Sequence, residues 1–331
     1  MQATRLHDPA AVPPGGGGDR EARRPPAIVV RDLCKSYGGV EAVGGVDLEV
    51  AQGEIFALLG PNGAGKTTTI EILEGFRARD GGDAEVLGFD PANRATSRQL
   101  RERIGVVLQE PAIEPFLSVR HVLARQAGYF RRPRAVADVA VLVGLTAKID
   151  ARVKTLSGGQ LRKLDLALGV IGNPELLILD EPTTGFDPAA RHEAWNLIRA
   201  LASEGATVLL TTHYMDEAQA LASRVAIMSD GQIVAEGSPG SLGGHAQDSC
   251  RIRFALPAGL DAGDLPVPAE PAGDSLEIRT GDEIRVLAEL TAWALESDVK
   301  LKGLTVERMT LEDVYLHYVG QAAAAGEEDG K

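Results

Sequence analysis

The sequence predicts an α/β fold with a mixed sheet, and three observations support this prediction. Four short, mainly apolar segments have the length of strands that are covered on both faces. Segments with the spacing of helices lie between them. Glycine or polar residues follow each apolar segment, at the strand ends where α/β sheets bind ligands. The four segments are residues 55–59, 104–108, 176–180 and 207–212.

The length and composition are those of a globular protein. The chain has 331 residues, which suggests two domains or one large domain with an appendage. Apolar residues make up 44% of the chain and charged residues 24%. The net charge is −13. This charge argues against nucleic acid or an anionic membrane surface as the main partner, because both need a basic footprint.

Neither a membrane span nor a secretion signal is evident in the sequence. No apolar run approaches the ~20 residues needed to cross a bilayer, and the N-terminus lacks the apolar core of a signal peptide. Cys34 and Cys250 match no metal or redox spacing, so we expect two buried thiols. We therefore expect a cytoplasmic protein, which could still dock on a membrane protein.

The first part of the chain reads as an extension followed by two strands. Residues 1–26 are rich in Pro, Gly, Ala and Arg and are predicted to be disordered. Residues 27–33 and 40–50 are predicted strands with a turn at residues 35–38 between them. Tyr37 in this turn either packs at the strand end or offers its ring to a flat heterocycle such as a purine.

A phosphate-binding loop is the most specific motif. Gly60–Thr68 fits the pattern G-x-x-x-x-G-K-[ST], between the apolar segment 55–59 and a predicted helix at 67–76. In such a loop Lys66 would reach the β- and γ-phosphates and the Thr67 hydroxyl would bind Mg²⁺. The nine candidate nucleotide-binding residues are Gly60, Pro61, Asn62, Gly63, Ala64, Gly65, Lys66, Thr67 and Thr68.

Gln109 ends the next apolar segment. Residues 81–88 indicate a turn and a short strand, and residues 98–103 indicate a short helix. The strand 104–108 then leads to Gln109, whose side chain would lie at a ligand-binding edge. Gln109 either binds Mg²⁺ and contacts the attacking water or is a surface glutamine.

A small helical insert precedes a second candidate anion site. Helical spacing is present at 118–130 and 135–143, and the insert is predicted to span about 97–170. Leu-Ser-Gly-Gly-Gln at 156–160 precedes a helix at 161–170. Ser-Gly-Gly at a helix start is an N-cap with free N–H groups, which suit an anion.

Two carboxylates end the third apolar segment. Asp180 at the end of strand 176–180 is placed to hold Mg²⁺ through water, and Glu181 is the candidate general base. The alternative is an acid pair that caps a turn before Pro182. A phosphate-binding loop in the same predicted sheet favours the catalytic interpretation.

A histidine ends the fourth apolar segment. His213 follows the strand 207–212 and could donate a hydrogen bond to the γ-phosphate and orient water. Helices are predicted on either side of this strand, at 189–204 and 214–223. A hairpin through an Asp-Gly turn follows at 225–236.

The composition changes after residue 240. A linker-like stretch at 241–248 precedes strand-like and helical segments, which predict a small α+β appendage at 249–319. The tail 320–331 is predicted to be disordered. The nucleotide-binding domain is expected at 27–240. The appendage has predicted strands at 250–256, 275–280 and 299–306 and predicted helices at 283–296 and 311–319.

The motifs together resemble one family, the ATP-binding subunits of ABC transporters. The resemblance covers residues 27–239 and implies a P-loop NTPase core with a mixed sheet and a helical subdomain that carries LSGGQ. It also implies ATP and Mg²⁺ as cofactors. The motifs, in the family's order, are Tyr37, the loop 60–68, Gln109, LSGGQ at 156–160, LLILDEP at 176–182 and His213.

The resemblance implies a homodimer in the ATP-bound state, with two subunits head to tail. Each ATP would lie between the loop 60–68 of one subunit and the LSGGQ motif of the other, contributed by Ser157, Gly158, Gly159 and Gln160. Tyr37 would stack on adenine, and Asp187 would couple the two sites. Phe186 stands where the family usually has leucine, which we expect to alter packing at this interface.

The resemblance also implies catalytic roles. Asp180 and Gln109 would complete the Mg²⁺ site begun by Thr67. Glu181 would activate the attacking water, and His213 would hold the γ-phosphate. The step is phosphoryl transfer to water, catalysed by positioning and charge stabilisation.

A finer resemblance is to the multidrug and antibiotic-resistance exporter branch, of the daunorubicin type. It rests on residues 105–110, 212–218 and 311–316 and on the appendage. It implies export of a drug, antibiotic or other hydrophobic compound through a separate integral-membrane permease subunit. The chain would then be peripheral on the inner face of the cell membrane.

Two alternative functions would involve other partners than an exporter permease. One is an importer ATPase, because importers also carry C-terminal domains. A soluble ABC-type factor acting on ribosomes or DNA is the other. Its translation type has two cassettes where one is found here, and its DNA-repair type has coiled-coil or zinc insertions. The acidic charge also opposes it.

Overall fold

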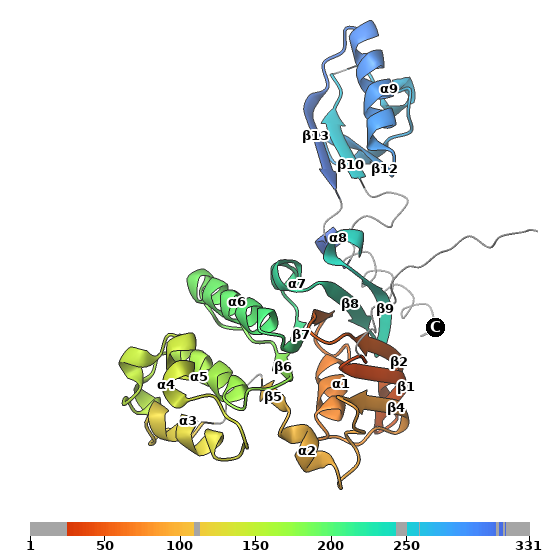
Figure 1. The fold of residues 1–331 in the computed structure, drawn as a ribbon. Coiled ribbons are helices and arrows are strands. Elements are labelled where there is room, and N and C mark those ends of the chain that lie inside the picture. Colours follow the sequence, from red (N-terminus) through yellow and green to blue (C-terminus); the bar gives the residue numbers. More distant parts are fainter. Residues whose placement is uncertain are drawn as a thin grey trace, which may run out of the picture.

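The computed structural model describes residues 25–108, 113–242, 250–257, 259–308, 311–313 and 315. Its strands form three sheets (Figure 1). The six-stranded sheet has the order β5-β6-β7-β3-β8-β9, and a three-stranded sheet of order β2-β1-β4 lies beside it. A four-stranded sheet, β11-β12-β10-β13, lies with α9 at one end of the molecule.

The three-stranded sheet is antiparallel and consists of β1 (Ile28–Tyr37), β2 (Val40–Val50) and β4 (Gly81–Val86). The predicted turn at 35–38 was wrong, because β1 continues to Tyr37, which pairs with Val40. Gly38 and Gly39 both have positive φ angles, so two residues are enough to reverse the chain.

The six-stranded sheet is mixed, as predicted. Five strands are parallel, and β9 pairs antiparallel with β8 through Asp230 and Gly231, which both have positive φ angles, as such a two-residue turn requires. The carboxyl ends of the parallel strands therefore meet at one edge. The strands are β3 (Ile55–Leu59), β5 (Ile104–Val107), β6 (Leu176–Asp180), β7 (Thr207–Thr212), β8 (Arg224–Ser229) and β9 (Gln232–Gly237).

Helices flank this sheet, and a separate helical group packs beyond β5 (Figure 1). In that group α3, α4 and α5 pack on one another, and α5 also packs on β5. The helices are α1 (Lys66–Leu73), α2 (Ser97–Arg101), α3 (Val119–Ala127), α4 (Val136–Leu142), α5 (Gly158–Val170), α6 (Pro188–Ser203), α7 (Met215–Leu221) and α8 (Pro239–Leu242).

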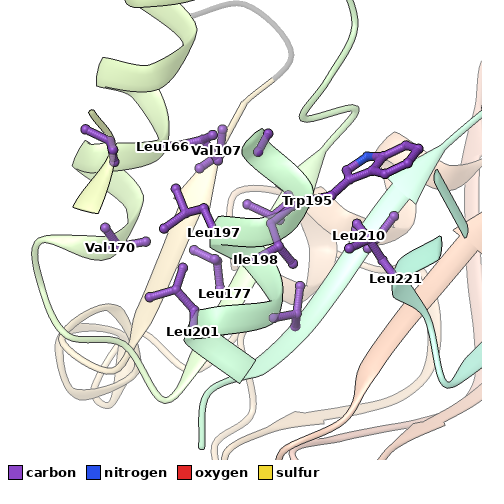
Figure 2. Close-up of a cluster of buried hydrophobic side chains, with 14 of the residues drawn as sticks. Val107, Leu166, Val170, Leu177, Trp195, Leu197, Ile198, Leu201, Leu210 and Leu221 are labelled. Atoms are coloured by element: carbon purple, nitrogen blue, oxygen red, sulfur yellow. The ribbon is translucent and has the colours of Figure 1, made fainter. Parts of the chain in front are cut away.

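Two hydrophobic clusters cover the two faces of the six-stranded sheet. In β3, Ile55, Ala57 and Leu59 point into one cluster, and Phe56 and Leu58 point into the other. Because both faces are buried, the strands read as unbroken apolar runs. Figure 2 shows the first cluster, in which the predicted core residues of α6 are buried. These residues are Trp195, Ile198 and Leu201.

The C-terminal unit has its own core. α9 packs on one face of the sheet, and the cluster includes Ile252, Phe254 and Leu290. Cys250 is buried there as predicted, whereas Cys34 is only half-buried, which corrects the expectation of two buried thiols. The elements are β10 (Cys250–Ala255), β11 (Glu270–Ala272), β12 (Ser275–Thr280), α9 (Glu283–Glu296) and β13 (Lys302–Arg308).

Three residues near the C-terminus, Leu311, Asp313 and Tyr315, contact one or the other of the two units. Leu311 belongs to the hydrophobic cluster of the six-stranded sheet, and Tyr315 packs against it. Asp313 instead accepts a hydrogen bond from Arg251 of β10 at 2.9 Å. Disorder was predicted at 1–26 and 320–331, and of these residues 1–24 and 320–331 lie outside the described residues, as does most of the predicted final helix. Within the described ranges, no helix is both long and apolar enough to cross a membrane.

Candidate functional site

The loop between β3 and α1 makes a tight turn at the carboxyl edge of the sheet. Gly63 and Gly65 have φ angles of 85° and 100°, which residues with a Cβ rarely adopt. A Cβ on Gly65 would lie 2.3 Å from the carbonyl oxygen of Ala42. No side chain caps α1, so its first N–H groups suit an anion. Thr67, in its first turn, is exposed.

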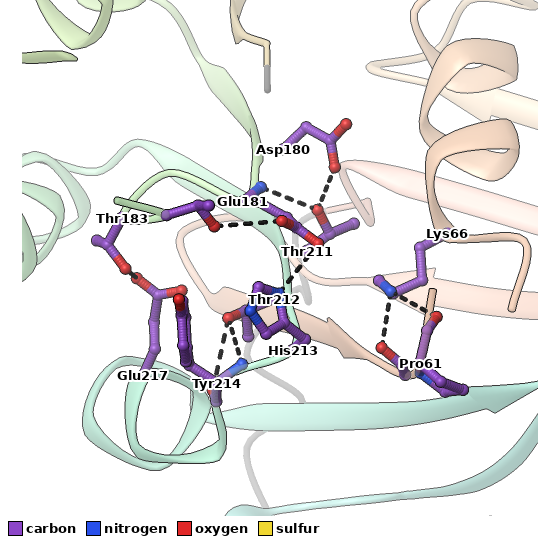
Figure 3. Close-up of polar contacts among 12 residues, drawn as sticks. Pro61, Lys66, Asp180, Glu181, Thr183, Thr211, Thr212, His213, Tyr214 and Glu217 are labelled. Atoms are coloured by element: carbon purple, nitrogen blue, oxygen red, sulfur yellow. Dashed lines mark hydrogen bonds and ion pairs between the residues drawn. The ribbon is translucent and has the colours of Figure 1, made fainter. Parts of the chain in front are cut away.

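Lys66 is buried beside this loop. Its ammonium group donates hydrogen bonds to the carbonyl oxygens of Gly60 at 2.7 Å and Pro61 at 2.9 Å (Figure 3). Burial lowers the pKa of Lys66, and the charges of Glu181 and Asp180 oppose that shift. The ammonium group therefore lies on the same edge of the sheet as the two acids.

Asp180 ends β6 as a buried carboxylate. Thr211 of the neighbouring strand β7 donates a hydrogen bond to it (Figure 3). Burial raises the pKa of Asp180, and the charge of Glu181 adds to the shift. A divalent cation would relieve this cost of buried negative charge. Asp180 and the Thr67 hydroxyl are oxygen donors of the kind that hold Mg²⁺ together with nucleotide phosphates.

Glu181 has an unusual backbone. Its φ angle is 48°, in the left-handed region, and its N–H group lies 3.1 Å from Thr211 Oγ1. Strained backbone of this kind persists where the surrounding structure fixes it, often at functional sites. Thr184 Oγ1 donates to Glu181 Oε2 at 3.2 Å, so the carboxylate is held at the edge of the sheet.

His213 lies directly against Glu181. Nδ1 of His213 is 3.1 Å from Glu181 Oε1, and the ring contacts the ring of Tyr214 with centroids 4.1 Å apart (Figure 3). The histidine follows the last residue of β7, and Glu181 follows the last residue of β6. The structure thus brings together Lys66, Asp180, Glu181 and His213, as the sequence predicted.

Glu217 is a buried acid that the sequence analysis did not single out. Thr183 Oγ1 and Trp195 Nε1 donate to its Oε1 at 2.8 and 3.0 Å, so α7 is joined to the loop after Glu181 and to α6. Burial raises the pKa of Glu217. Its place in a seven-residue helix that begins with acids suggested an ordinary surface residue.

Arg162 is a second residue that was missed. One guanidinium nitrogen donates to the carbonyl oxygen of Leu108 at 2.7 Å, and the other donates to the carbonyl oxygen of Glu181 at 3.1 Å. Asp165 pairs with it at 3.1 Å, and burial raises the pKa of Asp165 to about 6. The signal in the sequence was an Arg and an Asp three residues apart in a helix whose other residues are mostly apolar or glycine.

The LSGGQ segment begins α5 as predicted. Ser157 Oγ accepts a hydrogen bond from the Gln160 N–H at 3.3 Å, and Gln160 Oε1 accepts one from the Ser157 N–H at 3.1 Å. This reciprocal pair fixes the helix start. Ser157 and Gly158 are exposed, in contrast to Lys66 and Asp180.

The remaining candidates lie around these groups. Tyr37 is 39% exposed, and the guanidinium carbon of Arg77 is 5.1 Å from the centre of its ring. Asp187 caps α6 by accepting from the Ala190 N–H at 2.9 Å, and Phe186 before it is buried. Gln109 lies outside the described residues, so its predicted role stays a prediction.

Comparison with known proteins supports the motif assignment. The family described as "ABC transporter" matches residues 43–184, and the family "ABC transporter domain-containing protein-like, C-terminal domain" matches residues 250–310. The chain is 37% identical to the daunorubicin/doxorubicin resistance ATP-binding protein DrrA of Streptomyces peucetius, over 90% of this chain and 93% of that protein.

Two further relatives widen the comparison. The Nod factor export ATP-binding protein I of Paraburkholderia xenovorans is 45% identical over 65% of this chain and 72% of its own. A solved structure of cbiO1 from Clostridium perfringens, described as part of the ABC transporter complex cbiONQ, superimposes with a TM-score of 0.62 at 28% identity. It covers 67% of this chain and 92% of that chain.

Proposed function

Because this chain belongs to the ABC transporter family, as an ATP-binding subunit that hydrolyses ATP, we propose that it powers export through a separate membrane permease. One observation carries the proposal. Lys66, Asp180, Glu181 and His213 come from three strand ends and meet at one edge of the sheet. The relatives that support the direction of transport are named for drug resistance and for Nod factor export.

The geometry supports distinct roles for the assembled side chains. Lys66 and the N–H groups at the start of α1 would bind the β- and γ-phosphates. Mg²⁺, when bound through Thr67 and Asp180, would neutralise charge on the phosphate oxygens. Glu181 is the general base for the attacking water. His213, 3.1 Å from that base, would orient it and hold the γ-phosphate.

A second subunit would complete the site. The exposed start of α5, with Ser157 and Gly158, offers N–H groups that suit the γ-phosphate of an ATP held by a partner subunit. We propose a head-to-tail homodimer in the ATP-bound state, with Asp187 near the interface. Tyr37 would stack on adenine, and Gln109 would join the Mg²⁺ site.

The transported compound is proposed to be a drug, an antibiotic or another hydrophobic molecule. The relative that covers 90% of this chain is a daunorubicin and doxorubicin resistance protein. The permease would hold the substrate, and this chain would be peripheral on the inner face of the membrane. ATP would close the dimer and hydrolysis would reopen it, which moves the permease.

Affinity purification from detergent-solubilised membranes of the host tests the proposal. The tagged full-length chain is expected to bring down a polytopic membrane protein in stoichiometric amount, and the identity of that protein would narrow the substrate. The complex should hydrolyse ATP. Recovery of ribosomal proteins or nucleic acid without any membrane protein would overturn the exporter assignment.

A further inference from the structure

Glu217 is a fully buried acid in the first turn of α7, four residues after His213. Its Oε1 accepts a hydrogen bond from Thr183 Oγ1 at 2.8 Å (Figure 3). The same oxygen accepts a second hydrogen bond from Trp195 Nε1 of α6 at 3.0 Å. A buried carboxyl group is costly, so its presence points to a role that an apolar side chain would not fill.

The bond between Glu217 and Thr183 joins two chain segments that have left the sheet. The parallel pairing of β6 with β7 holds the two strands together only as far as their carboxyl ends. Beyond these ends, one segment carries Glu181 and the other carries His213. Thr183 is two residues after Glu181, and Glu217 is four residues after His213. Their hydrogen bond therefore connects the segments on which the two proposed catalytic side chains lie.

The two segments bring Glu181 and His213 into contact. Thr184, the neighbour of Thr183, donates from Oγ1 to Glu181 Oε2 at 3.2 Å. His213 Nδ1 is 3.1 Å from Oε1 of the same carboxylate (Figure 3). Thr183 is fully buried, whereas the side chain of His213 is 35% exposed. The buried bond of Thr183 to Glu217 thus anchors a contact whose histidine is half-exposed.

We propose that Glu217 is a positioning residue for ATP hydrolysis, which holds His213 and Glu181 in the geometry needed for the attack of water. The rate of this step depends on how precisely the base and the histidine are placed at the γ-phosphate. ATP binding depends instead on the loop at 60–68, which follows a different strand, β3. The inference therefore concerns turnover rather than affinity, and it rests on the roles proposed above for Glu181 and His213.

A second contact between α6 and α7 supplies a matched control. Arg191 of α6 donates to Asp216 at 3.1 Å, and Asp216 is the residue before Glu217. The side chain of Asp216 is 58% exposed, and ion pairs at the surface contribute little. Both acids join α7 to α6, but of the two it is Glu217 that is also bonded to the segment after Glu181.

Three variants of the full-length chain test the role. Glu217→Leu should lower turnover at saturating ATP by at least about tenfold, with the ATP affinity within about threefold of wild type. Glu217→Gln keeps an acceptor oxygen for Thr183 and Trp195, so it should restore turnover to within about threefold of wild type. Asp216→Leu should also stay within about threefold. Turnover of Glu217→Leu at the wild-type rate, or Glu217→Gln as slow as Glu217→Leu, would overturn the proposal.

Thr183→Val separates positioning from stability. It breaks the same bond with nearly unchanged side-chain volume and should also lower turnover at least about tenfold, so it decides the question even if Glu217→Leu does not fold. The double variant Thr183→Val/Glu217→Leu replaces both partners by apolar groups, which should recover part of the stability lost in Glu217→Leu. Denaturant unfolding and turnover are measured together. Recovery of turnover in step with stability would overturn positioning and leave a merely structural bond.

Glu181→Gln, measured in parallel, separates this inference from the proposed catalytic roles. If Glu181→Gln turns over normally, Glu181 is not the base, and positioning by Glu217 fails with it. If Glu181→Gln is inactive while Glu217→Leu and Thr183→Val turn over at the wild-type rate, the base stands and the positioning role alone is overturned.

Discussion

Two regions of the molecule bury carboxylates in opposite ways. At the ATP site, Asp180 and Glu217 are buried without an arginine hydrogen-bonded to either carboxylate in the described structure, and burial raises the pKa of both. In the C-terminal unit, Glu277 is equally buried, but Arg253 and Arg279 donate to it at 2.7 and 2.8 Å.

The difference shows in the pKa of Glu277. Burial alone would raise it, but the hydrogen bonds from Arg279 and Arg253 and the charge of Arg251 hold it below its usual range. The C-terminal unit thus satisfies its buried charge internally, as a structural ion-pair network does. At the ATP site the positive charge of Lys66 and the hydrogen bond from Thr211 only partly offset the burial of Asp180, which suits a cation that arrives with the nucleotide.

The strongest test of this contrast is Glu181→Gln. If Glu181 is the general base, turnover should fall by about 10²–10⁴-fold while ATP still binds. Steady-state ATP hydrolysis and equilibrium nucleotide binding would measure the two effects. Glu85→Gln, at an exposed acid of β4, is the control and should leave both unchanged. Normal turnover by Glu181→Gln would remove Glu181 as the base.

Ser157→Arg tests whether the exposed half of the site belongs to a partner subunit. The bulky cation at the N-cap of α5 should block approach of the partner's ATP, so hydrolysis should fall about 10²-fold while the monomer binds ATP normally. ATP binding to the monomer and ATP turnover at saturating ATP are measured separately, so a loss of hydrolysis can be distinguished from a loss of ATP binding. Hydrolysis at the wild-type rate would contradict the head-to-tail dimer.

Lys66→Ala tests the buried half of the site. Removing a charged donor to phosphate should weaken ATP binding by roughly 10- to 100-fold. Calorimetric or fluorescent nucleotide titration would measure the change. Lys163→Ala, which removes a surface ion pair with Glu193, is the control. Unchanged affinity of Lys66→Ala would mean that the loop at 60–68 does not bind phosphate.

Much of the catalytic core could be predicted because its constraints are local. The loop 60–68 needs glycine at fixed positions, and buried strands such as β6 read as apolar runs that end at their functional residues. Strand order and register then bring Asp180 beside Thr211. The residues that the sequence analysis missed, Arg162 and Glu217, act through partners distant in sequence.

The C-terminal unit was predicted in outline only. The strand β11, with three residues, is too short to show a period. Leu311 and Tyr315 pack on the larger core, which no local pattern reveals. Whether residues 249–319 fold as an independent domain stays a prediction. The carboxyl group of Glu74 has no hydrogen-bond partner among the residues that the structure describes, and the sequence could not show this because it is a property of the packed structure.

Glu277→Gln tests the same contrast in the C-terminal unit, where the buried carboxylate has arginine partners. This change removes the acid with which Arg251, Arg253 and Arg279 all pair. We expect the free energy of unfolding to fall by about 1–3 kcal/mol, with ATP turnover unchanged. Denaturant unfolding and an ATPase assay would measure both. A large loss of turnover without a loss of stability would contradict a structural role for this network.

The smallest expected effect is a pH dependence at Glu217. Because its pKa in the folded chain is raised above the ordinary value, this acid contributes most stability at low pH and loses it as the pH rises through the folded pKa. Glu217→Gln stays neutral and can still accept from Thr183 and Trp195. The unfolding free energy of wild type should therefore decline relative to the variant as the pH rises above ~4.5, by at most about 1.4 kcal/mol per pH unit. Denaturant titrations at intervals of roughly one pH unit, from pH 5 to 8, measure this difference. A constant difference would show that Glu217 is ionised in the folded chain, like Glu277, and the contrast between the two regions would not extend to this residue.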